Sequence, residues 1–207
     1  MKNVLLIQPK LLVRKLYPKA IWCYSRSEKS IYLTFDDGPI PGLTEWVLDE
    51  LKKYDAKATF FCVGANILKH PDIFEKVKAA GHTVANHTMH HIKGFKHNVA
   101  DYLRETEECR QLIGNNLFRP PYGQLKRSQY HALADRNYKI VLWDVISYDY
   151  ENIPGERCAE NAIKNSKNGS IVLFHDNWKA EKNLKYALPL FLEHFAKLNY
   201  QFKALET

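Results

Sequence analysis

The stretch Ile31-Tyr32-Leu33-Thr34-Phe35-Asp36-Asp37-Gly38-Pro39 is the most informative part of this chain. Its first five residues form an apolar run that is typical of a buried strand. The Gly-Pro pair that follows must turn the chain. Two carboxylates therefore lie side by side where a strand ends. Their repulsion requires a positive group nearby, which a metal ion or an arginine would supply.

Beyond residue 30, strand-like and helix-like segments alternate along the chain. Strands are predicted at 31–35, 58–63, 82–86, 116–119, 138–143, 170–174 and, more weakly, 199–204. Helical patterns lie between them at 43–51, 71–80, 98–113, 126–137, 156–167 and 179–197, the last interrupted by Pro189. Alternating β and α units predict an α/β fold with a parallel sheet. About seven units in this length favour a closed or nearly closed barrel over an open doubly wound sheet.

Every unusual polar cluster of the sequence follows one of the predicted strands. The clusters are Asp36 with Asp37, the run His87 to His91, the run Arg119 to Gly123, Asp144 with Asp149, and His175 with Asp176. The carboxyl ends of parallel strands meet on one rim of the sheet, where α/β enzymes carry their active sites. Five clusters on that rim predict an active site there.

The histidine cluster contains a pair with metal-ligand spacing. His87 and His91 are four residues apart, so a helical turn would project both imidazoles from one face toward one cation. Two histidines and a carboxylate form a facial site with open positions, which serves hydrolysis or iron-dependent oxidation. A second adjacent aspartate favours hydrolysis, because a base must take a proton from the attacking water. Spacing alone leaves open which of Asp36 and Asp37 is the ligand.

The positive charge of the chain is concentrated at its N-terminus. Of the net charge of +7, residues 1–30 carry +6, from seven basic residues against Glu28. This division predicts a basic N-terminal segment, 1–30, packed on or preceding a catalytic domain, 31–207. Packing against the domain is favoured, although a partly amphipathic leader would allow a weak contact with an anionic membrane surface. No nucleic-acid-binding motif accompanies the charge, so a nucleic-acid partner is not expected.

Two further features bear on the compartment. The apolar run at residues 4–7 is too short for a secretory signal, and no stretch approaches the ~20 apolar residues of a membrane span. A cytoplasmic protein, or one at the cytoplasmic membrane surface, is therefore expected, unless a signal had been removed. The four cysteines are scattered, which predicts reduced core thiols. The oligomeric state stays open.

Five stretches in order resemble the motifs of the polysaccharide deacetylases, carbohydrate esterase family 4. They are Thr34-Phe35-Asp36-Asp37-Gly38-Pro39, His87-Thr88-x-x-His91, Arg119-Pro120-Pro121-Tyr122, Trp143-Asp144-Val145-x-Ser147-x-Asp149 and Leu173-x-His175. The resemblance covers about 31–205. It implies a distorted (β/α) barrel of about seven parallel strands, a divalent metal ion that is usually Zn²⁺, and removal of acetyl groups from N-acetylated sugars.

The resemblance also implies a role for each motif residue. Asp36 matches the catalytic base, and the metal ligands match Asp37, His87 and His91. His175 matches the general acid. Arg119 matches the residue that pairs with the base, and Asp149 matches the carboxylate that orients the acid. Substrate-binding positions fall on Pro120, Tyr122, Tyr150 and Leu173, with the backbone N–H of Tyr122 facing the oxyanion.

The fourth motif departs from the family pattern. Ile146 stands where an aspartate is common, and Tyr150 stands where tryptophan is common, so stacking on the substrate is expected to differ. The leading hypothesis is a metal-dependent deacetylase acting on chitooligosaccharide, peptidoglycan or a related glycan. Two alternatives stay open: an amidohydrolase for a non-sugar amide, and a metal-stabilised glycan-binding protein without catalysis.

Overall fold

The computed structural model describes residues 7–9 and 11–207, the side chains of Leu11 and Leu12 excepted. The first residues of the apolar run at 4–7, together with Lys2, Lys10 and those two leucine side chains of the expected amphipathic leader, lie outside the described part. Within the described residues, no helix combines the length and the apolar character that crossing a membrane requires.

The sheet consists of eight strands whose mutual pairings are all parallel. They are β1 (Ser30–Asp36), β2 (Ala58–Cys62), β3 (Thr83–Asn86), β4 (Leu117–Phe118), β5 (Lys139–Ile140), β6 (Val145–Ile146), β7 (Ser170–His175) and β8 (Gln201–Phe202). Seven run in the order β5-β4-β3-β2-β1-β7-β6, and β8 pairs with the start of β1. This order follows the chain around a circle without the reversal of a doubly wound sheet.

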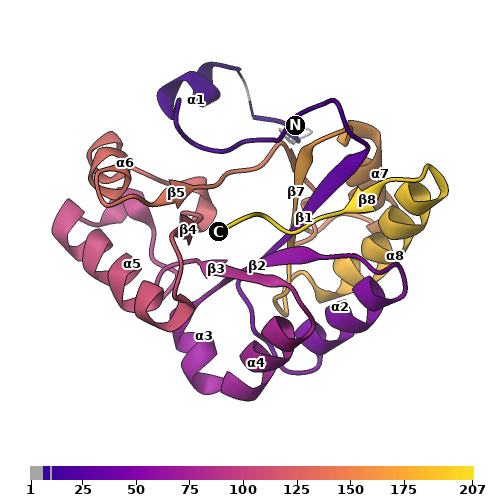
Figure 1. Cartoon of the computed structure of the whole chain (residues 1–207), viewed down its shortest axis with the longest axis horizontal. Coiled ribbons are helices and arrows are strands. Elements are labelled where there is room, and N and C mark those ends of the chain that lie inside the picture. The colour runs from indigo at the N-terminus through magenta and orange to yellow at the C-terminus, as the bar shows by residue number, and fades with distance from the viewer. Residues whose placement is uncertain (1–6, 10) are drawn as a thin grey trace.

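The sheet is curled, and helices cover its outside (Figure 1). The helices are α1 (Leu11–Leu16), α2 (Leu43–Lys52), α3 (Gly64–Lys69), α4 (Pro71–Ala79), α5 (Val99–Ile113), α6 (Arg127–Ala134), α7 (Gly155–Asn165) and α8 (Glu181–Lys197), with the 3₁₀ turns η1 (Gly94–Lys96) and η2 (Pro121–Gly123). The fold is therefore the expected distorted barrel of about seven parallel strands, and the open doubly wound alternative is wrong.

The main core lies between the central strands and the outer helices. Phe35 of β1 stacks on Phe60 of β2 at 5.0 Å between ring centroids, and both are buried. Phe174 of β7 meets Phe191 of α8 edge to face at 5.8 Å. Since large rings fill the layer on both sides of β1, that strand is held rigidly at the centre of the sheet.

Two details of the helix and strand pattern differ from expectation. Pro189 does not interrupt α8, which continues to Lys197. Pro189 is only half-buried, so water can satisfy the carbonyl group that loses its helical donor. The short helix α3 was not predicted, because six residues are too few to show a helical period.

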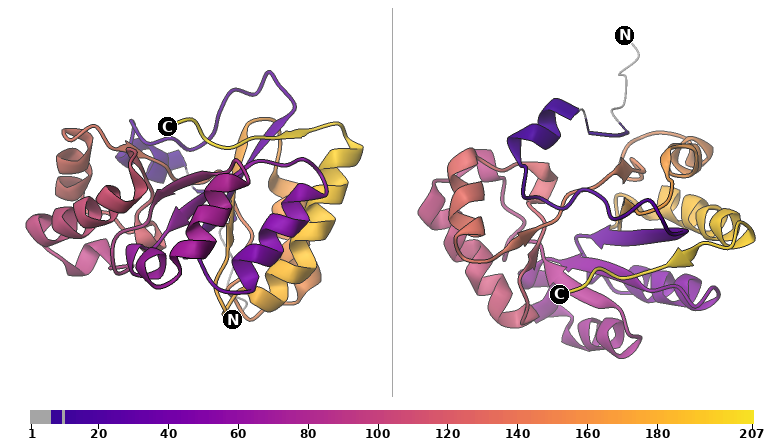
Figure 2. Two further views of the ribbon diagram at one scale, coloured as in Figure 1. Left: turned by 60° about the horizontal axis from the view of Figure 1, so that its bottom comes forward. Right: turned by 45° about the horizontal axis from the view of Figure 1, so that its top comes forward.

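A third difference lies between β5 and β6, the two ends of the sheet. The predicted strand 138–143 pairs with β4 only at Lys139–Ile140, and the chain then bends so that Val145 and Ile146 pair with β7. The N-terminal segment fills the gap beside this bend (Figure 2). Ile21 forms a parallel bridge with Val141, and Cys23 forms an antiparallel bridge with Ser170.

Two arginines of the basic leader are bound to one carboxylate of this bend. Asp144 is almost completely buried, and it accepts hydrogen bonds from Arg14 at 2.6 Å and from Arg26 at 2.8 Å. The hydroxyl of Ser170 also donates to Asp144, at 2.7 Å. Two of the seven basic residues of the segment are therefore engaged in attaching it to the barrel.

We expect Asp144→Asn to lower the free energy of unfolding by about 1–2 kcal/mol at pH 7, a modest value because both arginines are partly exposed. Burial would raise the pKa of Asp144, but Ser170, Arg26 and Arg14 lower it below its ordinary 3.8. The stabilisation is therefore present above that value and lost as the pH falls further. Urea unfolding at pH 7 and pH 3 measures it, and exposed Asp135→Asn is the control. An equal loss at both pH values would contradict the prediction.

Candidate active site

The polar clusters predicted at the strand ends meet on one rim. Asp36 and His175 are register partners at the ends of β1 and β7, and Asn86, which precedes His87, pairs with Phe118, which precedes Arg119. The rim surrounds a cleft of about 600 Å³. Its lining residues are Asp36, Asp37, His87, His91, Tyr122, Gly123, Trp143, Ile146, Tyr150, Leu173, His175, Asn177 and Lys179.

Three of these residues bring ligand atoms together. Asp37 Oδ1 lies 3.0 Å from His91 Nε2 and 3.6 Å from His87 Nε2, and the three ligand atoms lie within 4.8 Å of one another. Among the described residues no other group of three His, Cys, Asp or Glu side chains is so arranged. The rings of His87 and His91 are 5.0 Å apart at their centroids.

The two histidines come together through a loop and not through the helical turn that their spacing suggested. Residues 87–93 contain no helix, and Thr88 and His91 have positive φ angles of 66° and 53°. The start of α3 holds the loop, since the Gly64 N–H donates to Thr88 and the Ala65 N–H donates to Met89. A Cβ at Gly64 would collide with the Met89 sulfur. The pairing of the histidines is as expected, but its local structure is not.

The groups around Asp37 account for all its polar atoms except one. Its backbone has a φ of 89°, outside the range that most side chains adopt. Asn66 donates to its carbonyl oxygen at 2.8 Å, and Asn177 donates to Oδ2 at 2.5 Å. The remaining oxygen, Oδ1, is buried and accepts no hydrogen bond. A buried carboxylate oxygen without a donor, beside two imidazole nitrogens, fits a cation ligand.

The hydrogen bond of His87 and the pKa shifts of His87 and Asp37 agree with this interpretation. The Nδ1–H of His87 donates to the carbonyl oxygen of Arg119 at 2.8 Å, which leaves Nε2 as the free ring nitrogen. Burial lowers the pKa of His87 to about 4, so the ring is neutral. Burial would raise the pKa of Asp37, but His91, His175 and His87 lower it well below its ordinary value. The residues present therefore fit a divalent metal ion.

Asp36 has a different partner. Its Oδ1 accepts a hydrogen bond from Arg119 Nη1 at 2.7 Å, and both side chains are buried. The guanidinium also donates to the Thr34 hydroxyl, to the Leu142 carbonyl and, at 3.4 Å, to the Val141 carbonyl. It lies 4.0 Å from the Phe61 ring centroid. This burial excludes an ordinary surface ion pair between Asp36 and Arg119.

His175, at the end of β7, is held by Asp149. Its Nδ1–H donates to Asp149 Oδ1 at 2.8 Å, and its backbone N–H donates to Oδ2 at 2.7 Å. Burial alone would lower the pKa of His175, but the carboxylate of Asp149, with smaller effects of Asp37 and Asp36, raises it to about 9. Asp149 is completely buried, so this pair is also not a surface ion pair.

The expected substrate-binding residues divide into two groups. Tyr122, Tyr150 and Leu173 line the cleft, and Tyr150 meets the His175 ring edge to face at 4.8 Å. Pro120 does not line the cleft. It lies buried before η2, where its carbonyl accepts from Gly123 N–H and supports the loop that carries Tyr122.

The sequence interpretation missed several contributors. Asn177 and Asn66 hold Asp37, and Trp143 and Lys179 line the cleft. Asp176 is fully buried and braces the turn after Asp37, since Gly38 N–H and the Thr44 hydroxyl donate to its two oxygens. Trp143 stands in the fourth motif, where it had been given no role, and Asn177 follows His175 by two positions; these were the only available signals. Asn66 had none, because its partner is a backbone atom 29 positions earlier.

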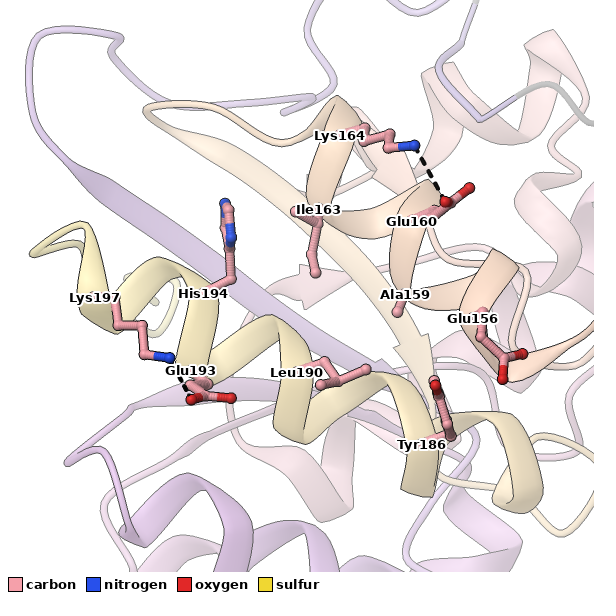
Figure 3. Close-up of a pocket in the computed structure, with 10 residues that line it drawn as sticks. All are labelled: Glu156, Ala159, Glu160, Ile163, Lys164, Tyr186, Leu190, Glu193, His194 and Lys197. Atoms are coloured by element: carbon pink, nitrogen blue, oxygen red, sulfur yellow. Dashed lines mark hydrogen bonds and ion pairs between the residues drawn. The ribbon is translucent and has the colours of Figure 1, made fainter.

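A second hollow lies between α7 and α8, away from this rim (Figure 3). It measures about 440 Å³ and contains the helix-surface ion pairs Glu160–Lys164 and Glu193–Lys197. The ion pairs in this hollow are exposed, whereas the pairs Asp36–Arg119 and Asp149–His175 on the rim are largely buried. The catalytic chemistry is therefore assigned to the rim cleft.

Comparison with known proteins agrees with the site. A family model described as polysaccharide deacetylase matches residues 24–141, which include both aspartates, both histidines and Arg119. The chain is 34% identical over 203 residues to a peptidoglycan-N-acetylglucosamine deacetylase of Bacillus cereus, with 93% of this chain and 94% of that protein covered. It is 32% identical over 157 residues to a chitooligosaccharide deacetylase of Rhizobium leguminosarum bv. trifolii, with 72% of each covered.

A solved structure shows the same likeness in three dimensions. The Bc1960 peptidoglycan N-acetylglucosamine deacetylase matches with a TM-score of 0.85 at 28% identity, and the match covers 95% of both chains. The similarity therefore extends beyond residue 141 to the part of the chain that carries Asp149 and His175.

We expect Asp149→Asn to lower the pKa of His175 well below about 9, because the carboxylate that raises it most is lost and only the smaller effects of Asp37 and Asp36 still oppose burial. In the wild type, the raised pKa stabilises the fold below about 6.5 and this contribution is lost as the pH rises through about 9. NMR titration of the metal-free protein measures both values. His82, whose pKa is about 4, is an internal control that should not move. An unchanged His175 titration would contradict the assignment.

Proposed function

The chain belongs to the polysaccharide deacetylase family, and we propose that its rim cleft removes the acetyl group of an N-acetylglucosamine residue by metal-assisted hydrolysis. The observation that carries the proposal is the arrangement of one buried carboxylate, Asp36 paired with Arg119, and one histidine, His175 paired with Asp149, on adjacent strands beside the metal-ligand triad. Water attacks the acetyl carbonyl carbon, the carbon–nitrogen bond breaks, and acetate and the free amine are released.

Asp37, His87 and His91 would hold the metal ion. Two imidazole nitrogens and a carboxylate oxygen are a ligand set that suits Zn²⁺ and leaves positions open, so Zn²⁺ is the proposed ion. When bound, such an ion lowers the pKa of water and polarises a carbonyl oxygen. Deacetylases of this family depend on a metal, which agrees with the triad.

Asp36 is proposed as the general base. Its Oδ2 lies 3.7 Å from His87 Nε2, so it faces the triad, while Oδ1 is held by Arg119. The guanidinium stays protonated at ordinary pH and holds Oδ1 of the carboxylate by a charge-assisted hydrogen bond. The carboxylate is thus oriented to accept the proton of the attacking water at Oδ2.

His175 is proposed as the general acid. Its Nδ1–H is engaged by Asp149, so Nε2 is the atom that can deliver a proton to the departing amine nitrogen. A pKa raised to about 9 keeps this proton on the ring at neutral pH. Asp36 and His175 therefore supply the two proton transfers that hydrolysis of an amide requires.

The walls of the cleft support an acetyl group as the acyl part. Leu173 and Tyr150 form an apolar side next to His175, where a methyl group would be removed from water. The backbone N–H of Tyr122 is the proposed donor to the developing oxyanion. Tyr122 has a φ of 60°, so its backbone departs from the helical conformation of the surrounding 3₁₀ turn η2.

The substrate is proposed to be a residue of a glycan. The Bacillus cereus relative that matches nearly the whole chain is a peptidoglycan-N-acetylglucosamine deacetylase, which supports N-acetylglucosamine in a cell-wall glycan over a non-sugar amide. Acetate release from peptidoglycan fragments and N-acetylglucosamine oligomers, with and without a chelator, tests the proposal. Full activity after complete metal removal would overturn it.

We expect His87→Ala to abolish stoichiometric metal binding and activity, because one of three ligands is lost. Metal content per chain after dialysis, measured by mass spectrometry, gives the result, and the wild type should retain one Zn²⁺. His90→Ala is the matched control, since His90 is exposed, contacts Glu105 and lies outside the triad. Retention of one ion by the His87 variant would contradict the ligand set.

We expect Asp36→Asn to keep the metal ion but to lower kcat by about 10²–10⁴-fold, because the amide cannot take the proton from water. Acetate release and metal content are measured on the same preparation. Asp49→Asn, an exposed change on α2, should leave both values unchanged. Thermal unfolding shows whether the variant remains folded without the ion pair to Arg119. Normal turnover would rule out Asp36 as the base.

A further inference from the structure

The catalytic cleft does not end at the residues that carry the chemistry. A groove of about 300 Å³ adjoins it, and five residues line both hollows: Tyr122, Gly123, Trp143, Ile146 and Tyr150. The far side of this groove is made by the N-terminal segment, through Pro9, Val13, Tyr17 and Trp22. The segment therefore does more than close the barrel, because it supplies one wall of a hollow continuous with the catalytic cleft.

The chemistry of the groove restricts what it can bind. Six of its eleven lining residues are aromatic, and none is charged: Tyr17, Trp22, Tyr122, Trp143, Tyr148 and Tyr150 carry the rings. An anion or a cation would lose its hydration there without gaining a partner of opposite charge. A neutral ring with C–H groups on its faces and hydroxyls at its edge matches flat aromatic surfaces with polar tips. A pyranose has this form.

Trp143 is the wall that the two hollows share. The indole lies where a side chain at Gly123 would be, since a Cβ there would come within 2.7 Å of the ring. Gly123 also has a φ of 64°, which glycine adopts without strain. The glycine thus lets the η2 loop approach the indole closely, and the same ring faces the cleft and the groove.

The N-terminal wall is fixed in place by contacts on both sides of the groove. The Tyr17 hydroxyl donates to the Leu125 carbonyl at 2.5 Å, and its ring packs against Tyr130. The Arg14 guanidinium, bound to Asp144, lies 5.5 Å from the centroid of the Trp22 ring. A preformed surface loses little conformational entropy when a ligand binds.

We propose that this groove is a second sugar subsite, in which the N-terminal segment stacks on a neighbouring pyranose ring of the glycan whose N-acetylglucosamine residue occupies the catalytic cleft. The inference rests on the proposed function. It adds that binding of this neighbouring ring depends on the N-terminal wall formed by Pro9, Val13, Tyr17 and Trp22. The occupant is a sugar ring because the groove continues a cleft for a sugar and none of its described lining residues is charged.

The test fills the groove without removing any of its contacts. Val13 lies on α1, is 38% exposed and lines the groove, so Val13→Trp places bulk inside it. Leu16→Trp is the matched control, since Leu16 lies on the same helix, is 55% exposed and does not line the groove. The metal-loaded proteins are assayed for acetate release from N-acetylglucosamine oligomers of two to five sugars.

In the wild type and in Leu16→Trp, kcat/KM should rise with chain length. In Val13→Trp, the ratio of kcat/KM for the pentamer to that for the dimer should fall roughly 3- to 10-fold, the worth of one aromatic stacking contact. An unchanged ratio in Val13→Trp would overturn the subsite. A fall of the same size in Leu16→Trp would also overturn it, because the effect would not depend on the groove.

A binding measurement separates this inference from the proposed reaction. Calorimetric titration of each protein with the pentamer reports the groove whether or not acetate is released. If the wild type binds the pentamer and Val13→Trp binds it more weakly, the subsite stands even where no deacetylation is seen and the proposed function fails. If the wild type deacetylates but all three proteins bind the pentamer equally, the function stands and the subsite is wrong.

Discussion

The buried guanidinium of Arg119 is the interaction on which the rest of the site depends. Its side chain joins Asp36 and Thr34 of β1 to the carbonyl groups of Val141 and Leu142, and its own carbonyl fixes the ring of His87. The fully buried charge of Arg119 is tolerated because each of the three guanidinium nitrogens donates a hydrogen bond. The guanidinium also lies over the Phe61 ring. Arg119 therefore orients Asp36, the proposed base, and its carbonyl sets the tautomer of His87, a proposed ligand. It also links β1 to the chain after β5.

Two of the three proposed metal ligands, Asp37 and His91, by contrast lie on irregular backbone. Asp37, Thr88, His91 and Tyr122 all have positive φ angles, which cost free energy for residues other than glycine. The surrounding structure supports these conformations through the N-terminus of α3, Asn66, Asn177 and buried Asp176. Rigid strands bring the proton-transfer groups together, and strained loops held by secondary contacts bring the ligands together.

The N-terminal segment shows how one stretch can serve several purposes. Its arginines bind the buried Asp144, its backbone pairs at Ile21 and Cys23 in the gap of the sheet, and its aromatic side chains line the groove beside the cleft. The sequence favoured packing of this basic segment against the domain and left open a weak contact with an anionic membrane surface. In the structure, part of that charge neutralises an internal carboxylate, a role that net charge by itself cannot reveal.

The sequence determined the order of strands and helices, the rim on which the chemistry lies and most of the residues that meet there. It could do so because burial and strand ends leave local patterns, as at 31–39 and 170–176. Only the tertiary structure decided that the histidines meet through a loop, that Pro189 stays within α8, and that Asn66 and Trp143 belong to the site. These features depend on contacts between residues far apart in the chain, which no local pattern records.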